Sequence, residues 1–240
     1  MRAEPVCLLL PGMLCSDRLW QAQHQRLRRW AHLEVVALTG SSIEQMVEHI
    51  LALPYRRFAL AGLSLGGIAA LATAAAAPER IIGLAVLSAT AHPPRAEQRA
   101  SWSAMAARTQ SGDFASITSQ TLLPRLVNAQ HLPMPSIVDV VLGMADEIGP
   151  ATFLAQLSMQ ASRVDLRPHL AAITCPTMVI AGADDLLAPL QAQRELASLI
   201  AGARLEVLQE CGHLSPLERP ADVSDLLEGW LRGLAQQPDQ

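Results

Sequence analysis

The chain has 240 residues, of which half are hydrophobic and 17% are charged, and its formal net charge at pH 7 is -4. This length and composition predict one folded domain, either alone or with a sizeable insertion, and they exclude a disordered chain. The mildly negative charge argues against a polyanion-binding surface, so we expect no nucleic-acid partner.

Short apolar runs alternate with longer amphipathic stretches along the chain, which is typical of a parallel sheet covered by helices on both faces. The predicted strands are Val6–Leu10, Glu34–Leu38, Phe58–Ala61, Ile82–Leu87, Thr177–Ala181 and Arg204–Leu208. The predicted helices are Trp20–Trp30, Ser42–Ala52 with Ser42 as the N-cap, Leu65–Ala77, Leu190–Ile200 and Ala221–Gly233. The strands are rich in Val, Ile, Leu and Ala almost without interruption, which suits burial on both faces. The chain is therefore predicted to form an α/β fold.

Residues 91–168 interrupt this alternation. They contain no strand signal, only helical stretches broken by Pro and Gly residues. About 75 residues without structure would be unusual inside a compact domain, so we expect about four short helices inserted between two strands. The predicted organisation is a core domain of residues 1–90 and 169–240, with residues 91–168 forming a helical cap over one edge of the sheet.

Neither the start of the chain nor its most apolar segment indicates membrane insertion. Residues 1–16 contain a short apolar run interrupted by Pro and Gly, unlike a signal peptide. The alanine-rich segment Ile68–Ala77 is about half as long as a membrane span. We expect a soluble, cytoplasmic protein.

The segment RFALAGLSLGG, residues 57–67, places one serine where a strand is predicted to turn into a helix. Ser64 lies in a G-x-S-x-G pattern with Gly62 and Gly66. The pattern alone arises often by chance, but a strand before it and a helix after it are the context of a nucleophilic serine on a tight turn. We expect the Ser64 hydroxyl to be exposed above the carboxyl ends of the strands, with the amide of Leu65 as an oxyanion donor.

A serine hydroxyl needs a neighbouring base, and His213 has the context for that role. It follows the last predicted strand in the segment ECGHLSPLERP, so its imidazole is expected at the carboxyl edge of the sheet. A carboxylate must orient the imidazole, and both Asp184 and Asp185 follow a predicted strand. Spacing alone does not choose between these two aspartates. The order serine, aspartate, histidine is that of a hydrolase built on a doubly wound sheet.

Together these motifs resemble the serine-nucleophile branch of the α/β-hydrolase superfamily, and the resemblance covers nearly the whole chain. GLSLGG resembles the nucleophile elbow of the family, and CGHLSPLERP resembles the segment that contains its catalytic histidine. In GADDLLAP, the family's acid stands three residues after the glycine and four before the proline, which implies Asp185 as the acid. The chain looks most similar to small bacterial carboxylesterases and 3-oxoadipate enol-lactonase-like hydrolases. The resemblance implies the α/β-hydrolase fold with an inserted helical cap, or lid.

Two features depart from the family pattern. After its first core strand the family usually has His-Gly, whereas this chain has Pro11 and Gly12. The resemblance implies the backbone amide of Met13 as the second oxyanion donor, and an amide donor needs no particular side chain. Only five residues precede Val6, which leaves no room for the antiparallel hairpin that often opens the fold. We therefore expect six strands, all parallel, with the first strand central.

Ser64 favours acyl transfer over the reactions of relatives that use an aspartate nucleophile, such as haloalkane dehalogenases and epoxide hydrolases. We expect a serine hydrolase that cleaves a small-molecule carboxylic ester or lactone through an acyl-enzyme. A thioesterase or a carbon–carbon bond hydrolase with the same triad is an alternative. A ligand-sensing α/β-hydrolase with slow turnover is another, and rapid multiple turnover of p-nitrophenyl esters would argue against it. The sequence predicts no oligomeric state.

The predictions for the substrate pocket rest on position along the chain. Met13 and Leu14 are expected at its mouth, beside the oxyanion hole. Bulky cap side chains are candidates to face the serine, with helix packing as the alternative for each: Trp102, Phe114, Met144 and Phe153. Arg163 is a candidate to bind a substrate carboxylate, or else an ion-pair partner of Asp165 or Glu147. We expect an apolar-walled pocket that prefers short to medium acyl chains over charged ones.

We expect no metal site and no organic cofactor. The chain has no Cys/His cluster with ligand spacing and no dinucleotide-binding fingerprint, and its four scattered cysteines are predicted to be free thiols. All 18 basic residues are arginine, which excludes a lysine nucleophile. A catalytic histidine works as a base only while it is neutral, and a free histidine ionises near pH 6.5. Activity is therefore expected to rise with pH between about 6 and 8.

Overall fold

The computed structural model describes residues 4–236 and places six parallel strands in one sheet, in the order β2-β1-β3-β4-β5-β6. The strands are β1 (Val6–Leu10), β2 (His32–Val35), β3 (Phe58–Leu63), β4 (Ile81–Leu87), β5 (Thr177–Gly182) and β6 (Arg204–Leu208). The predicted parallel α/β sheet is confirmed. The expectation of a central first strand is wrong, because only β2 is added on the outer side of β1 while four strands follow on its other side.

The observed elements begin and end close to the predicted ones, with one clear shift at the second strand. Its bounds move toward the N-terminus because its register is set by pairing with β1, from Val6 opposite His32 to Leu9 opposite Val35. The helices of the described residues are α1 (Gln21–Leu27), α2 (Ile43–Leu51), α3 (Leu65–Ala76), α4 (Ala96–Gln110), α5 (Leu123–Leu126), α6 (Pro135–Ala161), α7 (Leu190–Ser198), α8 (Ser215–Glu218) and α9 (Pro220–Gln236). Ser42 caps α2 as predicted, because its side chain accepts a hydrogen bond from the Gln45 amide at 3.1 Å.

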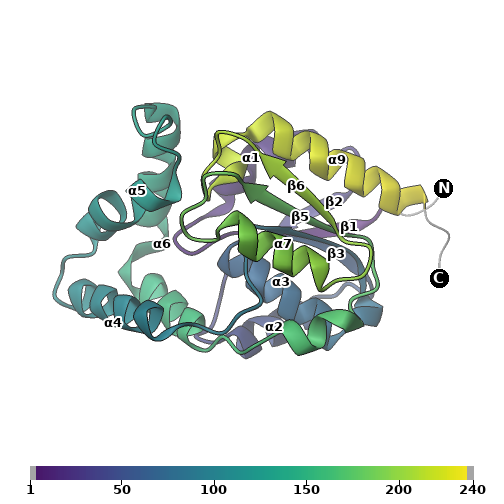
Figure 1. Cartoon of the computed structure of the whole chain (residues 1–240), viewed down its shortest axis with the longest axis horizontal. Helices are drawn as coiled ribbons and strands as arrows, with labels where there is room; N and C mark the ends of the chain where they lie inside the picture. Colours follow the sequence, from purple (N-terminus) through teal and green to yellow (C-terminus); the bar gives the residue numbers. More distant parts are fainter. Residues whose placement is uncertain (1–3, 237–240) are drawn as a thin grey trace.

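Helices cover both faces of the sheet, as Figure 1 shows. Helices α1 and α9 lie on one face, and α2, α3 and α7 lie on the other. Successive strand residues point to opposite faces. In β1, Leu8 therefore packs in the core under α2 and α3, whereas Leu9 packs with Leu27 and Leu227 under α1 and α9. This double burial explains why the strands are apolar without alternation.

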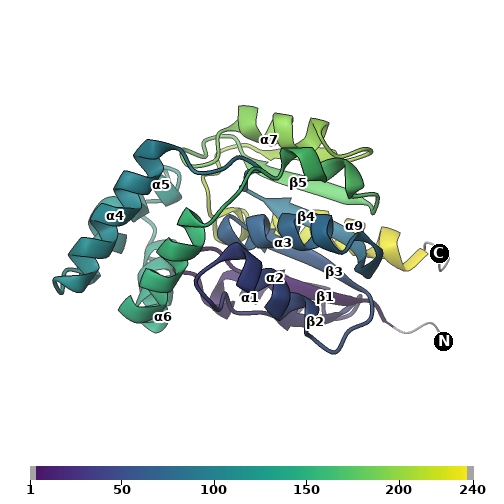
Figure 2. The same ribbon diagram turned by 90° about the horizontal axis from the view of Figure 1, so that it is seen from below.

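The segment between β4 and β5 is helical and lies beyond the carboxyl ends of the strands, where α4, α5 and α6 gather (Figure 2). It contains α4 of 15 residues, the short α5, and α6 of 27 residues, which consists of two helices joined at a kink, so the expected number of helices is found although α4 is not short. Helix α6 is kinked at Gly149, whose φ of 72° and ψ of 170° are outside the helical region. Proline at position 150 disfavours helical angles in the residue before it, and glycine alone adopts such a backbone readily. Within residues 4–236, no helix combines the length and apolarity that crossing a membrane requires.

Candidate active site

Ser64 occupies a strained turn between β3 and α3, with φ 54° and ψ -114°. A non-glycine residue in such a region costs about 1–3 kcal/mol, so the surrounding structure must enforce it. Two glycines make the turn possible. A Cβ at Gly62 would lie 2.5 Å from the carbonyl oxygen of Gly66, and a Cβ at Gly66 would clash with the carbonyl oxygens of Leu10 and Pro11. The turn holds the partly exposed Ser64 at the N-terminus of α3.

His213 and Asp185 form a buried hydrogen-bonded pair. The Nδ1 of His213 lies 2.8 Å from the Oδ2 of Asp185, and the two residues are 3% and 5% exposed. An ionised carboxylate only accepts hydrogen bonds, so Nδ1–H donates and Nε2 remains free to accept a proton. The Oδ1 of Asp185 also accepts hydrogen bonds from the amides of Leu187 at 2.8 Å and Ala188 at 2.9 Å. The carboxylate is therefore fixed from both sides.

The two neighbouring aspartates have different electrostatic surroundings. Burial alone would raise the pKa of Asp185, but the charge and hydrogen bond of His213 and the two backbone amides outweigh it and hold that pKa below its usual value. Asp185 is thus ionised at neutral pH. Asp184 instead accepts a hydrogen bond from the side-chain amide of Asn128 at 2.8 Å.

A close approach of two loops brings this pair together. A Cβ at Gly182, the last residue of β5, would clash with the carbonyl oxygens of Cys211 and Gly212. Only glycine allows the end of β5 to meet the loop after β6 this closely. The aspartate that follows β5 can therefore reach the histidine that follows β6.

Ser64 and His213 line one cavity of about 360 Å³, and Met13 lines it as well. Its walls come from the loops at the carboxyl ends of the strands and from the helical segment between β4 and β5. Asp185 is not among the lining residues. Ser64 and His213 thus line a space large enough for a small molecule, and Asp185 contacts His213 from outside it.

The two predicted oxyanion amides belong to Met13 and Leu65. Leu65 is the first residue of α3, so its amide has no acceptor within the helix. Next to Met13, the amide of Leu14 donates to the Oε1 of Gln156 at 2.9 Å in a buried hydrogen bond. Gln156, on α6, thus anchors the loop after β1. The sequence offered no signal for it beyond a polar residue in an apolar stretch of helix.

Of the seven predicted pocket residues, Met13, Trp102 and Arg163 line the cavity. The other four occupy packing positions instead. Phe153 is fully buried and packs against Phe114 with ring centroids 5.6 Å apart, and Leu14 belongs to the same apolar cluster. Met144 is buried in the cluster on the α1 and α9 side of the sheet. These bulky side chains fill the contacts among helices and between helices and loops, which was the alternative interpretation.

The predicted ion pair of Arg163 is not formed, and that expectation is wrong. Asp165 pairs with Arg167 at 2.6 Å, two residues along the chain. Glu147 pairs with Arg18 at 3.0 Å, across from α6 to the loop after β1. Both carboxylates therefore have other partners, and neither forms an ion pair with Arg163.

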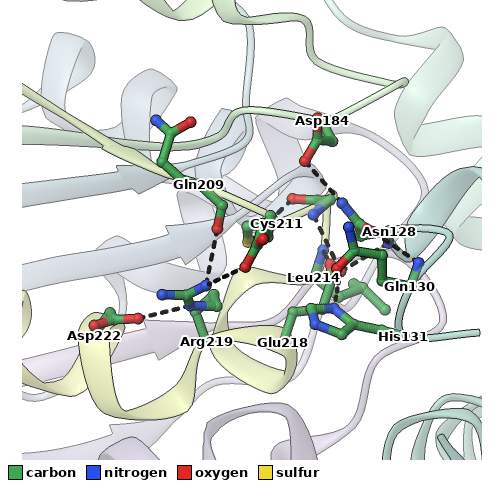
Figure 3. Close-up of polar contacts among 12 residues, drawn as sticks. Asn128, Gln130, His131, Asp184, Gln209, Cys211, Leu214, Glu218, Arg219 and Asp222 are labelled. Carbon is green, nitrogen blue, oxygen red and sulfur yellow. Dashed lines mark hydrogen bonds and ion pairs between the residues drawn. The ribbon is translucent and has the colours of Figure 1, made fainter.

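Figure 3 shows a buried carboxylate that sequence reasoning missed. The side chain of Glu218 is fully buried and accepts hydrogen bonds from the amides of Asn128 at 2.8 Å, Gly212 at 3.1 Å and Leu214 at 3.1 Å. The Nδ1 of His131 lies 2.9 Å from its Oε2. Gly212 and Leu214 flank His213, so Glu218 fixes that loop and ties it to the inserted helical segment. The only signal for Glu218 in the sequence was its position in the segment CGHLSPLERP, which also contains His213.

Cys15 also lines the cavity, but its thiol is not in the reactive form. Burial raises the pKa of Cys15 to about 12, although a backbone hydrogen bond with Gly12 lowers that pKa. The thiolate is the nucleophilic form of cysteine, so this group is inert at neutral pH. Within residues 4–236, no group of three or more His, Cys, Asp or Glu side chains could hold a metal ion.

Comparisons with known proteins identify the family of this fold. A family model described as alpha/beta hydrolase fold matches residues 10–220. The pimeloyl-[acyl-carrier protein] methyl ester esterase of Aromatoleum aromaticum is 29% identical over 249 residues, which cover 96% of this chain and 99% of that protein. A thermophilic esterase from Thermogutta terrifontis has a TM-score of 0.86 at 25% identity, covering 96% of this chain and 90% of its own. The enol-lactonase from Burkholderia xenovorans LB400 has the same TM-score at 24% identity, covering 96% and 92%, a likeness of fold alone.

Proposed function

Because the chain belongs to the α/β-hydrolase fold family, we propose that it is a serine hydrolase that cleaves a carboxylic ester or a lactone through an acyl-enzyme on Ser64. Its relationship to an esterase along almost the whole length of both chains supports ester hydrolysis. The observation that favours Ser64 as the nucleophile is the cavity it shares with His213, whose imidazole is hydrogen-bonded to Asp185 on its other nitrogen.

The first half of the reaction forms the acyl-enzyme. The Nε2 of His213 accepts the hydroxyl proton of Ser64 while Oγ attacks the carbonyl carbon. The amides of Met13 and Leu65 donate hydrogen bonds to the oxyanion of the tetrahedral intermediate. His213 then gives its proton to the leaving oxygen, the carbon–oxygen bond breaks, and Asp185 stabilises the imidazolium until that transfer is complete.

The second half releases the acid. A water molecule gives a proton to the Nε2 of His213 and attacks the acyl carbon. When this intermediate collapses, Ser64 leaves and takes the proton back from the imidazole. An ester yields an alcohol and an acid, whereas a lactone yields one hydroxy acid because its leaving oxygen remains attached to the acyl chain.

The inserted helices are proposed to act as a cap that selects substrates, with residues 91–168 as the cap and residues 1–90 and 169–240 as the core domain. Trp102 and Met105 on α4 and Gln160 on α6 line the cavity that Ser64 also lines. Side chains from the cap therefore form part of the space that an acyl or alcohol group would occupy.

Labelling with a fluorophosphonate tests the nucleophile. We expect a single covalent adduct on Ser64, located by peptide mass spectrometry, together with multiple turnover of p-nitrophenyl acetate. Ser64→Ala should lose both labelling and turnover, whereas Ser101→Ala, at another serine of the cavity wall, should keep both. Full activity of Ser64→Ala would refute the mechanism. A single burst with a lasting adduct would identify a slow ligand sensor in place of a hydrolase.

A further inference from the structure

Arg163 lines the cavity with Ser64 but has few hydrogen-bond acceptors within the protein. The residue is 6% exposed, and its Nε is buried without a hydrogen-bond partner among residues 4–236. Its Nη2 donates to the Oε1 of Gln98 over a long 3.4 Å, and its guanidinium lies over the ring of Trp102 at 5.0 Å. A guanidinium has five N–H donors, so most of its capacity is available to a ligand.

A buried cation without a counter-charge is unfavourable for the protein alone. Burial lowers the pKa of Arg163 to about 10, and the nearby charge of Arg99 contributes in the same direction. The residue remains charged at neutral pH. A carboxylate would relieve both effects, because it supplies the missing charge and can accept two parallel hydrogen bonds from the planar guanidinium.

The other charged groups of the cavity add one further net positive charge. Arg95, Arg125 and Glu97 also line it, and all three are exposed, so the walls contribute three cations and one carboxylate apart from the histidine. An excess of positive charge around a concave site attracts anionic ligands. The lining also contains apolar side chains expected from the sequence, such as Leu63 and Ile68, so the cavity combines apolar walls with an excess of positive charge.

We propose that the substrate of this site carries a free carboxylate, which Arg163 binds while Ser64 attacks the ester or lactone carbonyl. The substrate class is a monoester of a dicarboxylic acid or a lactone with a carboxylate substituent. This inference rests on the proposed serine hydrolase function and adds the charge of its substrate. The ring of Trp102 covers one face of the Arg163 guanidinium, so the N–H groups at the edge of the guanidinium remain available to the ligand.

The test compares two series of methyl esters that differ only in charge. One series is the monomethyl esters of straight-chain dicarboxylic acids from succinate to suberate, and the other has a primary amide in place of the free carboxylate. At the best chain length, the wild-type protein should have a kcat/KM at least about tenfold higher for the acid than for the amide of the same length. Arg163→Gln should lower kcat/KM for the acids by about 10- to 100-fold, mainly through KM, and change the amides by less than about threefold. Arg204→Gln, an exposed arginine on β6, should change neither series.

The outcomes separate this inference from the proposed function. Turnover of both series at equal rates, with an unchanged ratio in Arg163→Gln, would overturn the carboxylate site and leave the serine hydrolase intact. Hydrolysis of neither series would refute the proposed function. In that case titration calorimetry of the monomethyl esters with Ser64→Ala, with and without Arg163→Gln, still measures the carboxylate contact. Equal affinity of Ser64→Ala for acid and amide would overturn it.

A second measurement does not depend on the folding of Arg163→Gln. Adipate should inhibit the wild-type protein competitively, and adipamide, which has the same shape without charge, should inhibit at least about tenfold more weakly. Arg163→Lys should retain part of this difference, because lysine keeps the charge and loses the bidentate geometry. Equal inhibition by adipate and adipamide would overturn the inference.

Discussion

At the scale of single residues, Asp184 and Asp185 show how one position along the chain changes a side chain's role. Asp185 accepts hydrogen bonds from His213 and from two backbone amides, whereas Asp184 accepts one from the Asn128 side chain. Asp185→Asn should lower kcat by about 10⁴, because an amide favours the wrong imidazole tautomer and cannot stabilise the imidazolium. Asp184→Asn should lower kcat less than about tenfold. Steady-state hydrolysis of p-nitrophenyl esters measures both, and the reverse order would assign the orienting role to Asp184.

The same carboxylate makes a pH-dependent contribution to stability. The pKa of Asp185 is lower in the folded protein than in the unfolded chain, where an aspartate ionises near pH 3.9. A group of this kind stabilises the fold fully above the unfolded value, and the contribution is lost as the pH falls through the folded value. The Tm difference between the wild type and Asp185→Asn should therefore be largest between about pH 5 and 7 and shrink below about pH 4. A difference that is constant across pH 3 to 7 in thermal unfolding would contradict this assignment.

How much of the site the sequence predicts depends on whether a feature is local. The turn at Ser64 and the contact of Asp185 with His213 follow short motifs, since glycines at fixed positions permit one backbone path. The cavity wall is different. Trp102 and Phe153 are both large apolar residues on helices of the inserted segment, yet one lines the cavity and the other is enclosed between helices. Periodicity identifies a buried helix face, but the tertiary arrangement decides what that face meets.

At the scale of elements, Glu218 on α8 connects the loop that contains His213 to the inserted helices. Its carboxylate accepts three backbone hydrogen bonds without solvent exposure. In Glu218→Gln, one oxygen becomes an NH₂ group that points at a backbone N–H. The substitution should lower the free energy of unfolding by about 2–4 kcal/mol. It should also lower kcat for esters with little change in KM, because the imidazole loses its position while the cavity remains.

Chemical denaturation and steady-state kinetics measure these two effects. Glu79→Gln, at an exposed glutamate of the turn after α3, is the matched control and should change stability by less than about 0.5 kcal/mol. An unchanged kcat in a destabilised Glu218→Gln would restrict Glu218 to a structural role.

The elements themselves were predictable where the local pattern and the tertiary environment agree. β1 and β6 have the predicted bounds, and α2 begins at its predicted cap. The second strand moved because its register depends on β1, which no local pattern encodes. The inserted segment was predicted as helical with a break at Gly149 and Pro150, and α6 is kinked at Gly149 as expected.

At the scale of the whole molecule, the fit between the proposed cap and the rest of the chain predicts two different results from two similar substitutions. Trp102→Ala enlarges the cavity, so the preferred acyl chain should lengthen while labelling of Ser64 is unchanged. Phe153→Ala leaves a void among the helices and should lower the free energy of unfolding by about 3–5 kcal/mol, with an unchanged order of preferred esters. Hydrolysis of a p-nitrophenyl ester series measures the chain-length preference, and thermal unfolding measures the loss of stability. An unchanged preference in Trp102→Ala would mean that the cap does not select substrates.

The insertion between β4 and β5 also has a consequence for the order in which the molecule folds. Leu84 pairs with Thr177, 93 positions away (177 - 84), whereas Ala59 pairs with Gly83, 24 positions away (83 - 59). Closing the longer loop costs only about 1.2 kcal/mol more, for roughly two doublings of length, but contacts distant in sequence form slowly. We expect β1 to β4 to assemble first and β5 and β6 to dock last. Pulse-labelled hydrogen exchange during refolding would then protect β3 before β5, and simultaneous protection would contradict this order. Ser64 would thus be in place before Asp185 and His213, and a partly folded chain would have no hydrolase activity.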